Sequence, residues 1–126
     1  MYNEFEIEQD HSLVVARLLC PQLSVTIAEA LFEELRTRMR FDGALNFILD
    51  LTEVRFLSSA CLGMLVEMLQ DLDAVKGRIA LAGCCADVAF LFKVTRLDAV
   101  FNLYEDVPDA RAAFGDRTHL TGPRRG

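Results

Sequence analysis

The strongest constraint on the fold is a buried strand that leads into a serine pair and a long amphipathic segment. The run 45–51 is apolar at nearly every position, which is typical of a central strand covered on both faces. After a short loop, Ser58 and Ser59 precede apolar residues that recur at helical spacing as far as Lys76, and Gly77 ends the segment. Because serine is a preferred helix N-cap, we expect a helix that begins at one of the two serines.

Short apolar runs alternate with helix-periodic segments along the rest of the chain. Strands are expected at 5–8, 13–19, 45–51, 79–82 and 100–104, and helices at 24–42, 58–76, 86–95 and 107–114. The order is strand, strand, helix, strand, helix, strand, helix, strand, helix. Such alternation implies right-handed crossovers, so we predict an α/β fold with a mostly parallel sheet of about five strands and about four helices.

The chain is long enough for one domain. We place that domain at residues 1–114 of 126 and expect a disordered tail at 115–126, where hydrophobic periodicity ends. In the first helix two residues compete for the N-cap: Thr26 has capping-box spacing to Glu29, and Ser24 is the alternative.

Composition excludes several classes of function. The chain is 52% apolar and 25% charged, as in folded globular domains, and its net charge of −6 argues against binding to nucleic acid. No run approaches the ~18 apolar residues of a membrane span, so we expect no membrane insertion. The acidic start of the chain lacks the features of a signal peptide, which predicts a cytoplasmic location.

The sequence offers no catalytic or metal-binding motif. Its four cysteines, which we expect to be reduced, contain no CxxC pair; they are Cys20, Cys61, Cys84 and Cys85. The vicinal pair Cys84-Cys85 is a weak redox candidate. The histidines, His11 and His119, lie near the termini, so no zinc site and no serine–histidine nucleophile is expected. Because the sequence also lacks a phosphate-binding glycine loop, we predict neither a cofactor nor an enzymatic function.

The serine pair supports two interpretations. A serine at a helix start can be a structural cap or a phosphorylation site, because the first-turn amides and the helix dipole favour an anion there. The following helix carries a second apolar stripe at Cys61, Met64, Met68 and Val75. This stripe indicates either a deeply buried helix or a partner surface beside the serines.

The stretch 50–63, Asp-Leu-Thr-Glu-Val-Arg-Phe-Leu-Ser-Ser-Ala-Cys-Leu-Gly, resembles the signature of the STAS domain. This family includes sulfate transporter tails and anti-sigma-factor antagonists, and its pattern is roughly Asp-Leu-Ser-x-Val-x-Phe-Ile/Met-Asp-Ser-Ser/Ala-Gly-Leu-Gly. The resemblance extends from about Phe5 to Phe114 and agrees with the expected order of strands and helices.

The resemblance implies a regulatory protein that binds an anti-sigma factor or related serine kinase. Ser59 falls on the serine that such antagonists present to their kinase, and Ser58 is the rival acceptor. Phosphorylation would break the complex, and a serine phosphatase would restore it. The implied partner surface comprises Ser24, Leu57, Ser58, Ser59, Cys61, Met64 and Met68, and a homodimer is compatible with the sequence.

Three departures from the family pattern support an alternative. Ser58 stands where Asp is usual, Cys61 replaces Gly, and Pro-Gln-Leu-Ser at 21–24 stands where many members have Gly-Glu-Leu-Asp. The alternative is a STAS scaffold that is not phosphorylated. It would use the face formed by Cys61, Met64 and Met68 within a signalling assembly or a lipid-transport ABC complex.

Overall fold

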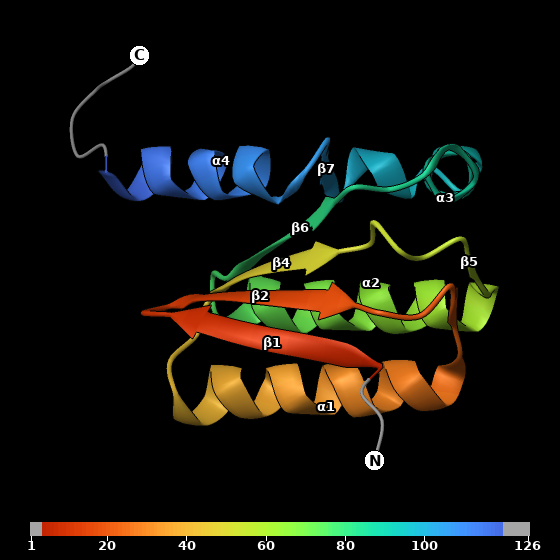
Figure 1. The fold of residues 1–126 in the computed structure, drawn as a ribbon. Coiled ribbons are helices and arrows are strands. Elements are labelled where there is room, and N and C mark those ends of the chain that lie inside the picture. The colour runs from red at the N-terminus through yellow and green to blue at the C-terminus, as the bar shows by residue number, and fades with distance from the viewer. Residues whose placement is uncertain (1–3, 120–126) are drawn as a thin grey trace.

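Five strands form the main sheet of the domain (Figure 1). A computed structural model describes residues 4–119, with side chains described as far as residue 114. The strands of the main sheet are β1 (Phe5–Asp10), β2 (Leu13–Leu18), β4 (Asn46–Asp50), β6 (Arg78–Ala82) and β7 (Asn102–Tyr104). The order across the sheet is β1-β2-β4-β6-β7, and only the β1–β2 hairpin is antiparallel.

The remaining elements connect these strands or follow the last of them. The helices are α1 (Val25–Phe41), α2 (Ser59–Ala74), α3 (Ala86–Val94) and α4 (Val107–His119), with a short 3-10 helix η1 (Leu97–Ala99). Two further strands, β3 (Gln22–Leu23) and β5 (Phe56–Leu57), pair in parallel as a separate small sheet. No helix within residues 4–119 is both long and apolar enough to cross a bilayer.

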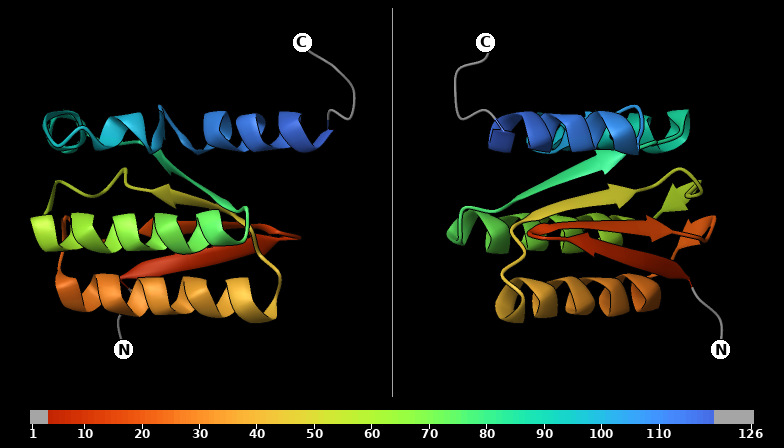
Figure 2. Two further views of the ribbon diagram at one scale, coloured as in Figure 1. Left: turned by 180° about the vertical axis from the view of Figure 1, so that it is seen from behind. Right: turned by 60° about the vertical axis from the view of Figure 1, so that its left-hand side comes forward.

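Helices cover both faces of the main sheet (Figures 1 and 2). Alternate side chains of each strand point to opposite faces, so Phe47 joins the larger core with α1 and α2, whereas Ile48 joins a smaller core under α4. On the α4 side, Ala110 and Phe114 supply the helix contribution to that smaller core. The central strand β4 is therefore buried on both faces, as its continuous apolar run predicted.

The α/β class, the mostly parallel five-stranded sheet and the four helices are confirmed. The pair β3–β5 was not predicted, because two-residue strands have no periodicity to detect. The last strand begins two residues later than expected, because the amides of Val100 and Phe101 hydrogen-bond to the carbonyl of Leu97, the first residue of η1. Helix α4 continues beyond Phe114 to His119, and the rest of the expected tail, 120–126, lies outside the described residues.

Candidate functional site

The helices α1 and α2 begin at the same end of the molecule, to the right in Figure 1. The small β3–β5 sheet joins the two segments that precede these helices: Gln22 pairs with Phe56, and Leu23 pairs with Leu57. The carbonyl of Pro21 accepts hydrogen bonds from the amides of Arg55 (2.7 Å) and Phe56 (3.1 Å). These non-local bonds hold the loop before Ser58 in a defined position.

Each of the two helix starts is capped by a serine in extended conformation. The Ser24 hydroxyl accepts a hydrogen bond from the amide of Ile27 at 3.2 Å, so Ser24, and not Thr26, is the N-cap of α1. The Ser58 hydroxyl accepts a hydrogen bond from the amide of Cys61 at 3.3 Å and caps α2. Ser58 therefore has a structural role at this site.

Ser59 has a different environment from its neighbour. It is the first residue of α2 and is exposed, and its hydroxyl makes no hydrogen bond within the described part of the chain. The first turn of α2 contains no acidic residue, so the positive end of the helix dipole has no carboxylate beside it there. Ser59 is thus an accessible hydroxyl at a position that favours an added anion.

Apolar side chains surround this end of α2, and sequence reasoning missed two of them. Phe56 is 56% exposed on β5, and Val25, which directly follows the Ser24 cap, is also exposed. Leu57, the neighbour of Phe56, is buried. In a two-residue strand, nothing in the local pattern shows which side chain faces the core; the pairing with β3 decides it.

Three of the expected partner contacts lie in the core. Leu57, Cys61 and Met68 are fully buried, so they support this end of the domain from beneath and do not form its surface. The Cys61 thiol donates a hydrogen bond to the carbonyl of Leu23 at 3.3 Å, which ties α2 to β3. The apolar stripe on α2 was wide because that helix packs against both the sheet and α1.

Met64, in the second turn of α2, is the member of the expected α2 face that remains half-exposed. It lines a groove of about 420 Å³ together with side chains of α1: Glu29, Glu33, Arg36, Thr37 and Arg40. An ion pair of 2.8 Å between Arg36 and Asp71 joins the two helices. Val75, at the other end of α2, is exposed but far along the helix from Ser59.

Asp50, the first residue of the family-like stretch, is a structural anchor. Its side chain is largely buried and accepts hydrogen bonds from the amide (3.0 Å) and hydroxyl (2.5 Å) of Thr52. Arg17 lies 3.6 Å away on the neighbouring strand. These contacts fix the turn between β4 and β5, and thereby the approach to the serines.

The cysteines are free thiols. Burial, with a smaller contribution from Cys85, raises the pKa of Cys84 to about 11, so this thiol is protonated and weakly nucleophilic at neutral pH. Burial also raises the pKa of Cys20. No three His, Cys, Asp or Glu side chains in the described part of the chain come together as a metal site.

The comparison with protein families decides the identity of the fold. A family model described as the STAS domain matches residues 4–110. The chain belongs to the STAS domain family. Its signature stretch is the turn anchored by Asp50 together with the start of α2, so the family motif and the serine-bearing site coincide.

Three solved structures illustrate the likeness. An anti-sigma factor antagonist from Mycobacterium paratuberculosis is 23% identical, with 86% of this chain and 91% of that chain aligned and a TM-score of 0.73. SpoIIAA of Bacillus, in its phosphorylated form, is 24% identical over 90% of this chain and 98% of that chain, with a TM-score of 0.66. The murine anion transporter Slc26a9 is 15% identical over 87% of this chain but 18% of that chain, with a TM-score of 0.69. At these identities the likeness establishes the shared fold.

Proposed function

We propose that this STAS domain is an anti-sigma-factor-antagonist-like regulatory protein of the bacterial cytoplasm. It binds an anti-sigma factor or related serine kinase through the end of the molecule where α2 begins. One observation carries the proposal: Ser59 offers a free, exposed hydroxyl at the helix start, while Ser58 is engaged as the cap. Similar STAS proteins named as anti-sigma factor antagonists support it.

The local physical chemistry supports phosphorylation of Ser59 as the switch. A phosphate adds about −1.5 to −2 charges, and at the first residue of α2 it meets free amides and a positive dipole end. The fold therefore tolerates the modification. The partner does not, because the phosphate would have to be desolvated beside the apolar contact made by Phe56. A serine phosphatase would reverse the switch.

Ser58 is a poorer acceptor than Ser59. Its hydroxyl oxygen already accepts the hydrogen bond from the Cys61 amide, and its side chain is partly buried. A kinase would have to break the cap of α2 to reach it. Ser24 caps the neighbouring helix α1 in the same way, so its hydroxyl oxygen also accepts a hydrogen bond from a backbone amide. Ser24 therefore contributes to the shape of the surface and does not offer a free hydroxyl.

The test is an affinity capture in which the domain is the bait. It compares two variants that carry the same added negative charge at different positions of α2. We expect the wild-type domain to capture a serine kinase or anti-sigma factor, and Ser59→Glu to weaken that capture at least about tenfold. Gln70→Glu, a matched exposed position further along the helix, should bind like wild type. With the captured kinase and ATP, intact-mass measurement should show one phosphate on wild type and on Ser58→Ala, and none on Ser59→Ala.

A STAS scaffold that is not phosphorylated is the second candidate. It is favoured by the serines that replace acids at positions 24 and 58 and by the likeness to the STAS portion of a transporter. The same baits distinguish the two. If Ser59→Glu retains its partners, no phosphate is incorporated, and Met64→Asp loses those partners, the protein is a scaffold that docks through the α1–α2 groove. Met68 is unsuited to this test because it is fully buried.

A further inference from the structure

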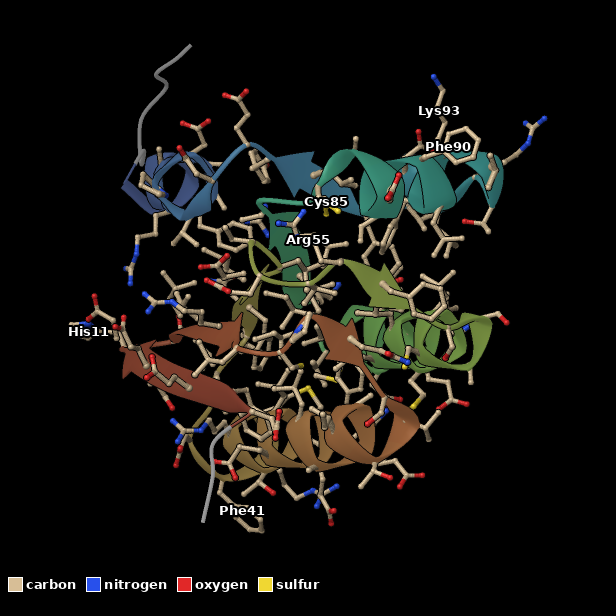
Figure 3. The ribbon with its side chains drawn as sticks, turned by 45° about the vertical axis from the view of Figure 1, so that its right-hand side comes forward. His11, Phe41, Arg55, Cys85, Phe90 and Lys93 are labelled. Atoms are coloured by element: carbon tan, nitrogen blue, oxygen red, sulfur yellow. The ribbon has the colours of Figure 1, made fainter. Side chains whose placement is uncertain are left out.

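Helix α3 presents an apolar ridge to solvent on the side opposite its core contacts. Phe90 is 63% exposed and Val94 is 56% exposed, and these two residues lie one helical turn apart. The inner face of the helix is anchored by Val88 and Phe92, and the ring of Phe92 packs edge-on against Phe101 at 5.9 Å. Phe90 points away from the rest of the molecule in Figure 3. The core contacts of Val88 and Phe92 therefore fix the orientation of the exposed ridge.

Two opposite charges flank this ridge. Asp87 lies three residues before Phe90 and Lys93 three residues after it, so the helical repeat places them on opposite sides of the ridge. Both are exposed, and neither forms an ion pair within the described part of the chain. The charges are therefore available to a partner.

This arrangement is complementary to itself. A two-fold axis parallel to the line from Phe90 to Val94 packs this ridge against the same ridge of a second copy. The same rotation exchanges the flanks, and Asp87 of each copy then faces Lys93 of the other. Packing of helices along their i, i+4 ridges is the commonest helix contact in globular proteins, and two-fold dimers use one self-complementary patch. We propose that this face of α3 is a homodimer interface.

A second copy fits this patch better than other occupants. An anionic bilayer is disfavoured because the chain has a net charge of −6. A purely acidic or purely basic segment would match one flank and be repelled by the other. A helix of nine residues buries less than the ~1,200 Å² of stable complexes, so the dimer is weak and depends on concentration.

The test uses charge reversals and sedimentation velocity from micromolar to millimolar protein. Wild type should pass from monomer to dimer, and Phe90→Asp should remain monomeric. Asp87→Lys and Lys93→Asp should each weaken self-association at least about tenfold. Each variant places like charges opposite one another at both symmetry-related flanks of the dimer. An equimolar mixture of these two variants should form a heterodimer, since every flank then meets the opposite charge.

The controls separate the interface from folding and from general surface effects. Circular dichroism and thermal unfolding confirm that each variant is folded. Phe41→Glu changes a more exposed phenylalanine at the end of α1 and should dimerise like wild type. Wild type that stays monomeric at millimolar concentration overturns the proposal, as does Phe90→Asp that dimerises or a charge-reversal mixture that associates no better than its components.

Discussion

Single residues at the start of α2 explain how this chain departs from the STAS pattern without losing the fold. Cys61 replaces the usual glycine, and its side chain fills buried space while its thiol bonds the Leu23 carbonyl. Ser58 replaces the usual aspartate and still caps the helix, because both residue types are good N-caps. The family architecture is kept, and the helix start loses one acidic side chain.

Gly83 is the residue whose replacement should damage the anchored turn most directly. It has a φ of +75°, and an added Cβ would collide with the Thr52 hydroxyl that is bonded to Asp50. We expect Gly83→Ala to lower the free energy of unfolding by about 2–3 kcal/mol in urea titrations.

Gly63 is the matched control for that substitution. It lies in α2 with a helical φ and open space around its Cβ position. Gly63→Ala should raise stability by about 0.5–1 kcal/mol, because alanine restricts the unfolded chain and favours helix. Equal effects of the two alanines would contradict the role assigned to the Gly83 turn.

At the scale of elements, the short β3–β5 pair has the largest effect on the site. It joins the segments that precede α1 and α2, so both caps and the exposed Phe56 lie at one end of the domain. Neither strand is long enough to be stable alone; each is held by Pro21 and by the buried side chains Leu23 and Leu57.

The two serines should differ in their contribution to the stability of α2. Ser58→Ala removes the cap and should lower the free energy of unfolding by about 1 kcal/mol, whereas Ser59→Ala should change it by less than about 0.5 kcal/mol. Urea denaturation followed by circular dichroism measures both. A loss of stability in Ser59→Ala as large as that in Ser58→Ala would reverse the roles of cap and acceptor.

At the scale of the whole molecule, the proposed partner site and the proposed dimer interface lie on different elements. Ser59 begins α2, whereas Phe90 projects outward from α3, which packs through its opposite face. The residues proposed for the two contacts are distinct, although α3 contacts β5, the strand that carries Phe56. A weak dimer would present two copies of the Ser59 site and raise the apparent affinity for an oligomeric partner through effective concentration.

This separation predicts that the two functions can be lost one at a time. Phe90→Asp, as a monomer, should bind one isolated partner molecule with the affinity of wild type within about twofold. Ser59→Glu should keep the wild-type dimer constant while it loses the partner. Isothermal titration and sedimentation velocity measure the two quantities, and a single substitution that abolishes both would show that the surfaces are coupled.

Local sequence signals predicted most of the secondary structure. Continuous apolar runs identified the strands and helical periodicity identified the helices, with serine caps as an added signal for α1 and α2, because these signals depend on neighbours a few residues apart. The sequence left the cap of α1 open between Ser24 and Thr26, since both have a suitable side chain and spacing. Backbone geometry at Ser24 decided it.

By itself, the sequence determined the alternation of strands and helices, the STAS signature, and a helix start at one of the two serines, Ser58 or Ser59. The structure assigned the cap to Ser58. The tertiary structure decided which side chains of that region reach solvent. It placed Cys61 and Met68 in the core, left Met64 half-exposed, and turned Phe56 outward. The reason is physical: exposure depends on contacts with α1, the sheet and β3, all distant in sequence, whereas a helix start depends on residues within one turn.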